Sequence, residues 1–245
     1  ASILIWWFPI PKGYLKKIFI ASLIANTLQY SITYTGLNLI DASAAVLLVQ
    51  TEVPFGVIFA YFMLKEKPTI RALVGISVAF IGVYILTGSP NLDGKFIGIA
   101  LTILGSAIWA LGQVIVKPLS KEINPLALVA WLAIFSGPIL IGISALIDGN
   151  TINYLTEASL NHWMIAFYIG FIMQPITYGC FYYVLKNNPL YKVLPVVTMG
   201  IPPTGLLAAI FLLGEKPTSE LFIGGGIIII GVIMIVFTKK REDRE

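Results

Sequence analysis

The sequence has very little of what enzymes and disulfide-stabilised domains depend on. Charged residues make up 11% of its 245 positions, and there is one cysteine, Cys180, and one histidine, His162. A single cysteine excludes an internal disulfide and a cysteine-rich metal site, and a single histidine gives little support to histidine-based catalysis. We therefore expect no catalytic residues, no metal site and no cofactor, and we predict that the protein is not an enzyme.

Apolar sequence takes the place of the missing charge. Apolar residues make up 58% of the chain, and the mean hydropathy is +0.89, far above that of a water-soluble domain. They form runs of roughly 18 to 24 residues, each about long enough to cross a ~30 Å hydrocarbon core as a helix. The sequence thus predicts an all-α integral membrane protein with eight complete spans. These are residues 18–37, 43–64, 70–86, 96–116, 126–147, 163–185, 190–213 and 221–238.

Basic residues are distributed unevenly between the connectors. When the connectors are assigned alternately to the two sides, one side carries all but two of the 16 lysines and arginines, and the other holds Lys95 and Lys216. The positive-inside rule then predicts a multi-pass protein of the cell membrane, typical of a bacterial inner membrane, with a cytoplasmic C-terminus. Since the basic residues are scattered over many loops, we expect membrane lipid and no nucleic acid as a partner.

The sequence matches itself at an offset of 149 residues. The segment L-K-E-K-P-T at 64–69 falls on L-G-E-K-P-T at 213–218, and we call the shared E-K-P-T the box. The offset also aligns Tyr34 with Tyr183, Gly56 with Gly205, Gly75 with Gly224 and Gly82 with Gly231. The two boxes fall on opposite sides in the predicted topology, so the two copies should cross in opposite directions. Inverted repeats of this kind are an architecture of secondary transporters.

The second copy contains two helices before its matched part begins. Their first-copy partners would lie largely before residue 1, and the apolar, uncharged residues 1–9 look like the end of such a span. We therefore expect ten helices, five plus five, with roughly 50 further N-terminal residues. The predicted domains are a first repeat at 1–90, a second at 96–239 and a cytoplasmic tail at 240–245. The alternative is a natural eight-helix protein with degenerate symmetry.

These segments resemble the EamA family of the drug/metabolite transporter superfamily. The resemblance rests on L-N-L-I-D-A-S-A-A-V-L-L at 37–48 and on the two boxes. The helix at 96–116, which carries Ser106, Trp109 and Ala110 and is followed by Lys117, is similar to the opening helix of an EamA repeat. The resemblance implies export or exchange of small metabolites by alternating access, without ATP.

Two segments, Q-T-E-V-P-F-G at 50–56 and S-A-I-W-A-L-G at 106–112, look most similar to the cysteine and O-acetylserine exporter type. That similarity implies amino acids or their derivatives as substrates. Two residues depart from the family pattern: Lys65, where a glycine usually precedes the glutamate, and Glu52, where a neutral residue is expected. The alternative function is a non-transporting membrane receptor or assembly subunit with the same fold.

Glu52 is the only acidic residue predicted in the middle of a span. A carboxylate at a helix centre costs about 2.5 kcal/mol or more on insertion scales, so we expect Glu52 to face a cavity or a partner. Two interpretations stay open. Glu52 is either a proton-coupling or substrate-amine site, or a protonated glutamate that hydrogen-bonds across helices for packing.

Prolines predict helix breaks at matched positions in the two copies. Pro54 cannot donate to the carbonyl of Gln50, and Pro202 and Pro203 free two carbonyls of the second copy. Broken helices at matched depth point to the central site of a transporter. The alternative is that these prolines only curve long spans. Gln50 and Glu52 are about 200° apart on a regular helix, so one narrow cavity cannot take both unless the kink turns one of them.

Three further sets of side chains are candidate substrate contacts. They are Asn26, Tyr30 and Thr33 on one predicted helix face, Gln174, Tyr178 and Tyr182 on the equivalent helix of the second copy, and Trp109, Gln113 and Trp131 as aromatic or amide contacts. For each set the alternative is packing or hydrogen bonding between helices.

Overall fold

The computed structural model describes residues 13–89, 92–149, 151–198 and 200–236, and every regular element within these ranges is helical. The chain divides into two compact units. Unit 1 comprises residues 1–31 and 115–187, and unit 2 comprises residues 32–114 and 188–245. Two helices, α3 (Gln29–Leu37) and α7 (Phe96–Glu122), begin in one unit and end in the other.

In the described part of the chain, five helices are long and apolar enough to cross a membrane. They are Ala42–Leu64, Ile70–Thr87, Phe96–Glu122, Pro125–Ile147 and Leu160–Asn187. Two shorter apolar helices are Ile201–Leu213 and Ser219–Ile235. The prediction of an all-helical, multi-pass membrane protein is therefore confirmed, whereas the count of eight complete spans stays a prediction.

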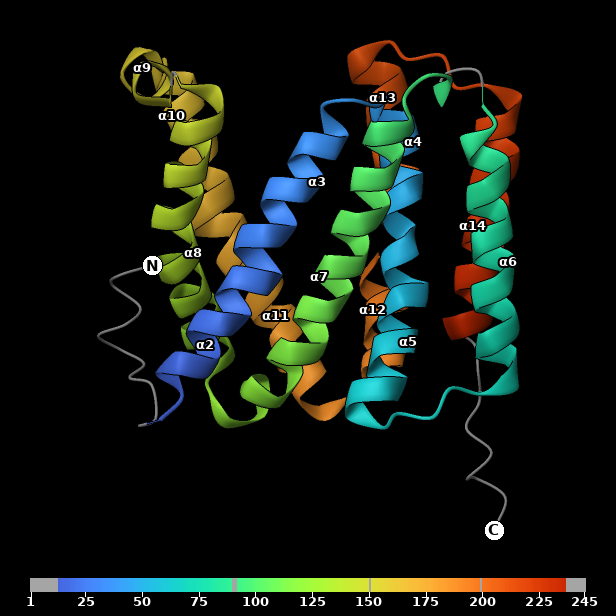
Figure 1. Cartoon of the computed structure of the whole chain (residues 1–245), viewed down its shortest axis with the longest axis horizontal. Helices are drawn as coiled ribbons and strands as arrows, with labels where there is room; N and C mark the ends of the chain where they lie inside the picture. The colour runs from blue at the N-terminus through green and yellow to red at the C-terminus, as the bar shows by residue number, and fades with distance from the viewer. Residues whose placement is uncertain (1–12, 90–91, 150, 199, 237–245) are drawn as a thin grey trace. The chain divides into compact units, whose positions relative to one another are not determined.

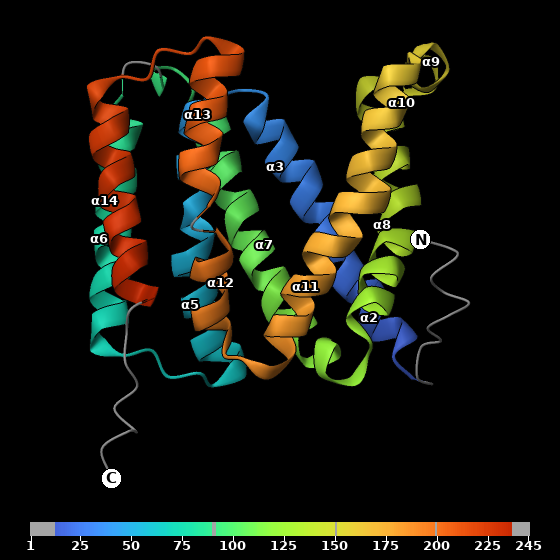
Figure 2. The same ribbon diagram turned by 180° about the vertical axis from the view of Figure 1, so that it is seen from behind.

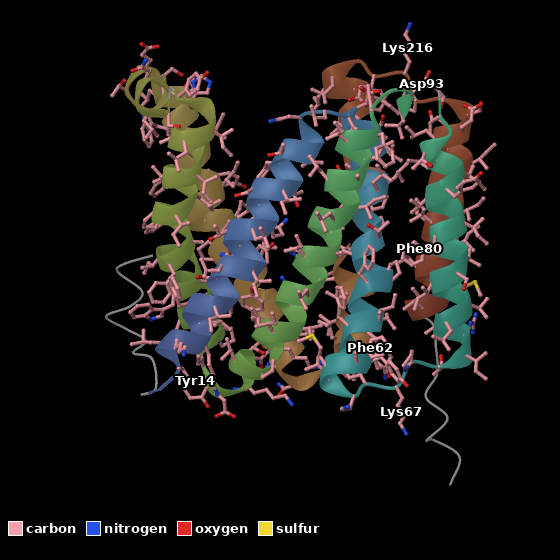
Figure 3. The ribbon with its side chains drawn as sticks, in the orientation of Figure 1. Tyr14, Phe62, Lys67, Phe80, Asp93 and Lys216 are labelled. Atoms are coloured by element: carbon pink, nitrogen blue, oxygen red, sulfur yellow. The ribbon has the colours of Figure 1, made fainter. Side chains whose placement is uncertain are left out.

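Unit 1 is built around α8 (Pro125–Asp148), which packs against α2 (Leu15–Ser22) and α11 (Gln174–Asn187). Figure 2 shows α11 running alongside α8. Gly179 permits this approach, because an added Cβ would lie 2.7 Å from Leu126 Cδ2. The remaining elements of unit 1 are η1 (Leu23–Leu28), α9 (Thr151–Glu157), α10 (Leu160–Phe167) and η4 (Tyr168–Met173).

Both η1 and η4 are π-helical, and each interrupts a long helix of unit 1. Pro175 gives a reason for η4, since it has no N–H for the carbonyl four residues back and its ring crowds that carbonyl. No proline lies near η1. There, the hydroxyls of Ser22 and Ser31 on either side donate to the carbonyls of Phe19 and Thr27, a contact that often bends helices. The apolar pattern of the sequence carries no sign of either π segment.

Unit 2 has a shared apolar core supplied by both sequence copies. Its elements are α4 (Ala42–Leu48), η2 (Val49–Thr51), α5 (Glu52–Leu64), α6 (Ile70–Thr87), the first part of α7, α12 (Leu190–Thr198), α13 (Ile201–Leu213) and α14 (Ser219–Val236). The first copy contributes fully buried residues such as Leu47 and Leu86, and the second contributes Leu221 and Ile228. The two copies therefore fold as one body in this unit.

The closest helix pair of unit 2 is α6 with α14, which lie side by side in Figures 1 and 2. An added Cβ on Gly75 would lie 2.7 Å from the carbonyl oxygen of Gly231, and one on Gly82 would lie 2.8 Å from that of Gly224. Small residues allow such approach of membrane helices. As residue numbers rise along α6 they fall along α14, so the two helices are antiparallel.

The long helices of unit 2 are interrupted at equivalent places. The 3₁₀ segment η2 separates α4 from α5, and α12 ends at Thr198 while α13 begins at Ile201. Adding 149 to residues 49–51 gives 198–200, so the interruptions coincide under the repeat. Pro54 lies three residues beyond η2, and its repeat equivalent Pro203 lies three residues beyond Gly200. At each position the missing N–H weakens the helix.

One predicted helix end was wrong, and one predicted connector contains a helix. The helix predicted to end at Val116 continues through Pro118 to Glu122, and Lys117 is 7% exposed, so this lysine lies inside the helix rather than at its end. The connector between the predicted spans at 126–147 and 163–185 contains the additional helix α9. An apolar run locates the hydrophobic part of a helix, whereas a helix continues wherever its backbone hydrogen bonds are supported.

Candidate functional site

A cavity of about 230 Å³ lies in unit 1, between α8 and the two helices that contain π segments. Five of the predicted candidates line it: Asn26 and Tyr30 from η1 and α3, and Gln174, Tyr178 and Tyr182 from α11. The other lining residues are Val129, Ala130, Leu132, Ala133, Ser136, Gly137, Gly170 and Pro175. None of the described lining residues is charged, so this cavity offers hydrogen bonds and aromatic surface.

Two hydrogen bonds link the polar side chains of the cavity. Asn26 Nδ2 donates to Ser136 Oγ at 3.3 Å, and Gln174 Nε2 donates to the Tyr30 hydroxyl at 3.1 Å. Each bond joins helices that are far apart in the sequence. Each bond fixes the orientation of an amide whose remaining donor and acceptor can contact a bound molecule.

The aromatic part of the cavity comes from α11. The rings of Tyr178 and Tyr182 have centroids 5.8 Å apart, and Phe181 lies 5.4 Å from Tyr182 and 6.2 Å from Tyr178. Tyr182 is 2% exposed, so its ring is held firmly by its neighbours. Aromatic faces attract ammonium groups, and tyrosine hydroxyls can contact either a carboxylate or an amine.

Sequence reasoning grouped some residues that the structure separates. Thr33, predicted on the face of Asn26 and Tyr30, lies in unit 2, where its hydroxyl occupies the space beside Gly105 of α7. Ser136 was missed, although a serine near the middle of the apolar run 126–147 was a usable signal.

The other predicted candidates lie in unit 2, except Trp131, which lies on α8 of unit 1. Gln50, Glu52 and Gln113 are 1%, 4% and 1% exposed, and Trp109 is half-buried. Within the described residues, Gln50 Nε2, Glu52 Oε1 and Gln113 Oε1 have no hydrogen-bond partner, and neither has Thr198 Oγ1 at the break of the second copy. Buried polar atoms without partners are costly, so in folded proteins such atoms are usually paired with protein groups, ordered water or a ligand.

The glutamates of the two boxes have a structural role that sequence reasoning missed. Glu215 accepts hydrogen bonds from the backbone N–H groups of Ala42 and Ser43 at 2.8 and 2.9 Å, at the start of α4. Glu66 accepts one from the N–H of Leu190 at 3.3 Å, at the start of α12. Carboxylates at helix N-termini satisfy free N–H groups and the positive end of the helix dipole. Each box therefore caps a helix of the other sequence copy.

The surroundings of Glu215 favour its ionised form. Partial burial alone would raise its pKa, but hydrogen bonds from Ser43 and Ala42 and the charge of Lys95 together lower the pKa below the ordinary value of 4.5. Lys95 also forms an ion pair with Asp41, with Nζ 2.9 Å from Oδ1. Nearby, Ser89 and Thr218 join their hydroxyls at 2.6 Å, which ties the end of α6 to the start of α14.

These features define a polytopic helical protein with a small uncharged cavity. In it, each of the two sequence copies caps a helix of the other copy. The model of the EamA-like transporter family matches residues 1–88 and 96–237. The chain belongs to this family, as its resemblance predicted, and it is a transporter-family protein rather than an enzyme.

Relatives of this chain include bacterial proteins described as a transporter and as efflux pumps. It is 30% identical over 239 residues to an uncharacterized transporter of Clostridium kluyveri. The aligned region covers 94% of this chain and 74% of that relative. It is 26% identical over 236 residues to a probable amino-acid metabolite efflux pump of Escherichia coli, with 93% and 78% covered. A protein of the same description from Salmonella typhimurium is 28% identical over 208 residues, with 80% and 68% covered.

Proposed function

We propose that the protein exports or exchanges small polar metabolites, such as amino acids or their derivatives, by alternating access. The observation that carries this proposal is the unit 1 cavity, which presents amides, hydroxyls and tyrosine rings and no charged side chain among its described lining residues. Bringing a net charge into such surroundings costs free energy, whereas a zwitterion brings its own counter-charge. Two relatives described as amino-acid metabolite efflux pumps support the same substrate class.

The size of the cavity also favours small substrates. At about 230 Å³ it lies below the roughly 300–1,000 Å³ of pockets that hold drug-sized ligands. We propose compounds on the scale of cysteine and O-acetylserine, whose exporters the segments 50–56 and 106–112 resemble.

The transport experiment uses the full-length native protein in vesicles, with a panel of amino acids and derivatives and with or without a pH gradient. We expect exchange of small zwitterions, and a several-fold higher KM in Gln174→Leu, which loses the bond to Tyr30 and leaves a half-buried hydroxyl with fewer partners. Tyr183→Phe is the matched control, because Tyr183 lies on the same helix and is 65% exposed. Absence of transport for every member of the panel would overturn the proposed substrate class.

We propose two inverted five-helix repeats as the underlying architecture, with eight complete spans in this chain. The contacts of α6 with α14 support it, because they exchange under the 149-residue offset. Gly75 faces Ile235, and its repeat equivalent Gly224 faces Leu86, which is the repeat equivalent of Ile235. Such reciprocal contacts are expected of a two-fold axis between antiparallel copies. The 14 to 2 distribution of basic residues supports a cytoplasmic C-terminus. Labelling of single cysteines at positions 150 and 243 from opposite sides of the membrane tests this orientation.

Glu52 is our candidate for proton coupling in unit 2. It is 4% exposed and follows directly on the helix break η2, and the described residues give its Oε1 no hydrogen-bond partner. A carboxyl group in such a place can bind and release a proton as the surrounding helices move. The alternative remains a protonated glutamate with a packing role.

A further inference from the structure

Two glycines lie in the wall of the unit 1 cavity. They are Gly137 of α8 and Gly170 of η4. An added Cβ on either would meet no heavy atom within 4 Å beyond its own stretch of helix. Gly179 of α11 differs, because its added Cβ would lie 2.7 Å from Leu126 Cδ2. Close helix packing thus accounts for Gly179, whereas the space beside Gly137 and Gly170 is open.

Gly137 lies on the face of α8 that borders the cavity. It follows Ala130 by seven residues and Ala133 by four, and both alanines line the cavity. Residues at these spacings share one face of an α-helix, so a side chain at position 137 would point toward the cavity. The preceding residue, Ser136, accepts the hydrogen bond from Asn26 Nδ2 at 3.3 Å. The open space at Gly137 is therefore next to a fixed amide.

Gly170 begins the row of cavity residues that continues along α11. It is followed at intervals of four residues by Gln174, Tyr178 and Tyr182, which all line the cavity. Four residues come close to a full turn of an α-helix and of a π-helix alike, so position 170 belongs to the same face. Gln174, one turn away, donates to the Tyr30 hydroxyl at 3.1 Å. The second open space is thus also beside a fixed amide.

Both glycines lie at the same end of the cavity. Figure 2 shows that α8 and the path from α10 to α11 run in opposite directions. Leu126, near the start of α8, meets Gly179, so rising residue numbers on α8 correspond to falling numbers on α11 and η4. Gly137 comes well after Leu126, and Gly170 comes well before Gly179. The cavity therefore has a glycine end and a tyrosine end, with the amide of Gln174 between them.

The missing side chains leave space that a substrate can occupy. A methyl group takes up about as much space as a water molecule, roughly 30 Å³, and the whole cavity holds about 230 Å³. Methyl groups at positions 137 and 170 would narrow the cavity, because no neighbouring atom already fills the places that they would take. A pocket that is short by one methylene group discriminates between substrates by about 10- to 200-fold.

We propose that Gly137 and Gly170 are specificity-determining residues, which set the largest side chain that the cavity admits. The side chain of the substrate lies at the glycine end, and its ammonium and carboxylate groups lie at the amides and tyrosines. This inference rests on the proposed transport function and deepens it, because it names amino acids with side chains longer than that of alanine as the substrate class. Alanine at position 137 or 170 should exclude the longest side chains first.

The transport test uses the full-length protein in vesicles with alanine, cysteine and O-acetylserine. The variants are Gly137→Ala and Gly170→Ala. The measured quantity is the KM of the largest transported compound divided by the KM of the smallest. We expect this ratio to rise by about tenfold in each variant, because the added methyl group competes with the end of the longer side chain. Thermal unfolding in detergent should show no loss of stability, since neither methyl group meets a neighbour.

Gly142→Ala is the matched control. Gly142 also lies on α8, and its added Cβ meets nothing within 4 Å. It is about 140° around the helix from Gly137, and it is not among the described residues that line the cavity. The control should keep the native ratio. A ratio that is unchanged in both cavity variants, or raised equally in the control, would overturn the inference.

A labelling test needs no substrate and therefore separates this inference from the transport proposal. Each full-length chain carries Cys180→Ser, which removes the exposed native thiol, and either Gly137→Cys or Gly142→Cys. The rates of reaction with a small and a bulky water-soluble maleimide are compared. We expect the preference for the small reagent to be several-fold greater at position 137, which borders a confined space, than at the exposed position 142.

Equal preference at the two positions would overturn the size limit even if transport is found. If the preference is found but no compound is transported, the transport proposal fails and the size limit of the cavity stands.

Discussion

Gly75 and Gly231 approach each other so closely that a Cβ on either would collide with the backbone of the facing helix. The Cβ of residue 75 would lie 2.7 Å from the carbonyl oxygen of Gly231, and that of residue 231 would lie 2.6 Å from the carbonyl oxygen of Gly75. The contact is reciprocal, and it joins the last described helix of each sequence copy. Glycine is required here for close approach rather than for a special backbone conformation.

The glycines of α14 should therefore differ sharply in their tolerance of alanine. Gly224→Ala places a Cβ 2.7 Å from the backbone nitrogen of Leu86, and we expect a loss of about 1–3 kcal/mol in the free energy of unfolding. Gly226→Ala meets nothing within 4 Å and should be neutral or stabilising by up to about 1 kcal/mol. Thermal unfolding in detergent measures both, and equal midpoints would contradict the close packing of α6 and α14.

Lys65 occupies a backbone conformation that favours glycine. Its φ is 59°, and its repeat equivalent Gly214 has a φ of 68°. The left-handed conformation costs a residue with a side chain roughly 1–2 kcal/mol. We expect Lys65→Gly to raise the free energy of unfolding by about 1 kcal/mol and Gly214→Lys to lower it by a similar amount. A lower unfolding temperature for Lys65→Gly would show that the lysine side chain compensates for the strain.

Glu215 should make the stability of unit 2 sensitive to acid. Its pKa in the folded protein is lowered below 4.5, so its contribution is present above the unfolded pKa and is lost as the pH falls through the folded pKa. We expect the difference in unfolding temperature between the native protein and Glu215→Gln to be constant near pH 7 and to shrink below about pH 4.5. The facing charges are Lys95 and Asp41, and Lys95→Gln should reduce the effect in part.

Glu52 can be tested by a nearly isosteric change. If Glu52 takes up a proton during transport, Glu52→Gln should fold normally, keep exchange at equal pH and lose the response to a pH gradient. Glu157→Gln, at an exposed position of α9, is the control for removal of a carboxylate. Gradient-driven transport by Glu52→Gln at the native rate would assign Glu52 to packing, and Glu52→Leu should then be unstable.

Much of the fold could be predicted because long apolar runs have few alternatives in a membrane. The spans at 43–64 and 70–86 agree within one residue at each end with helices Ala42–Leu64 and Ile70–Thr87. The family followed from the order and duplication of its motifs rather than from any single motif. The additional helix α9 was missed because it is short and polar enough to look like a connector.

The candidate site was predicted only in part. Asn26, Tyr30, Gln174 and Tyr178 share a cavity because polar residues on apolar helices face protein rather than lipid. The capping by Glu66 and Glu215 could not be predicted, because it joins residues more than 120 positions apart across two copies. Whether these cavity residues bind substrate stays a prediction until transport is measured.

The π segments η1 and η4 give the cavity helices a property that a helical wheel hides. A π turn holds one residue more than an α turn over the same hydrogen-bonded span, so every side chain beyond it is rotated by about 100° relative to an uninterrupted α-helix. Deletion of one residue within 23–28 would restore a regular helix and turn Tyr30 away from the cavity. Deletion of one residue within 168–173 would do the same to Gln174 and the lining residues that follow it on α11. The cavity is thus encoded by residue count as much as by residue type.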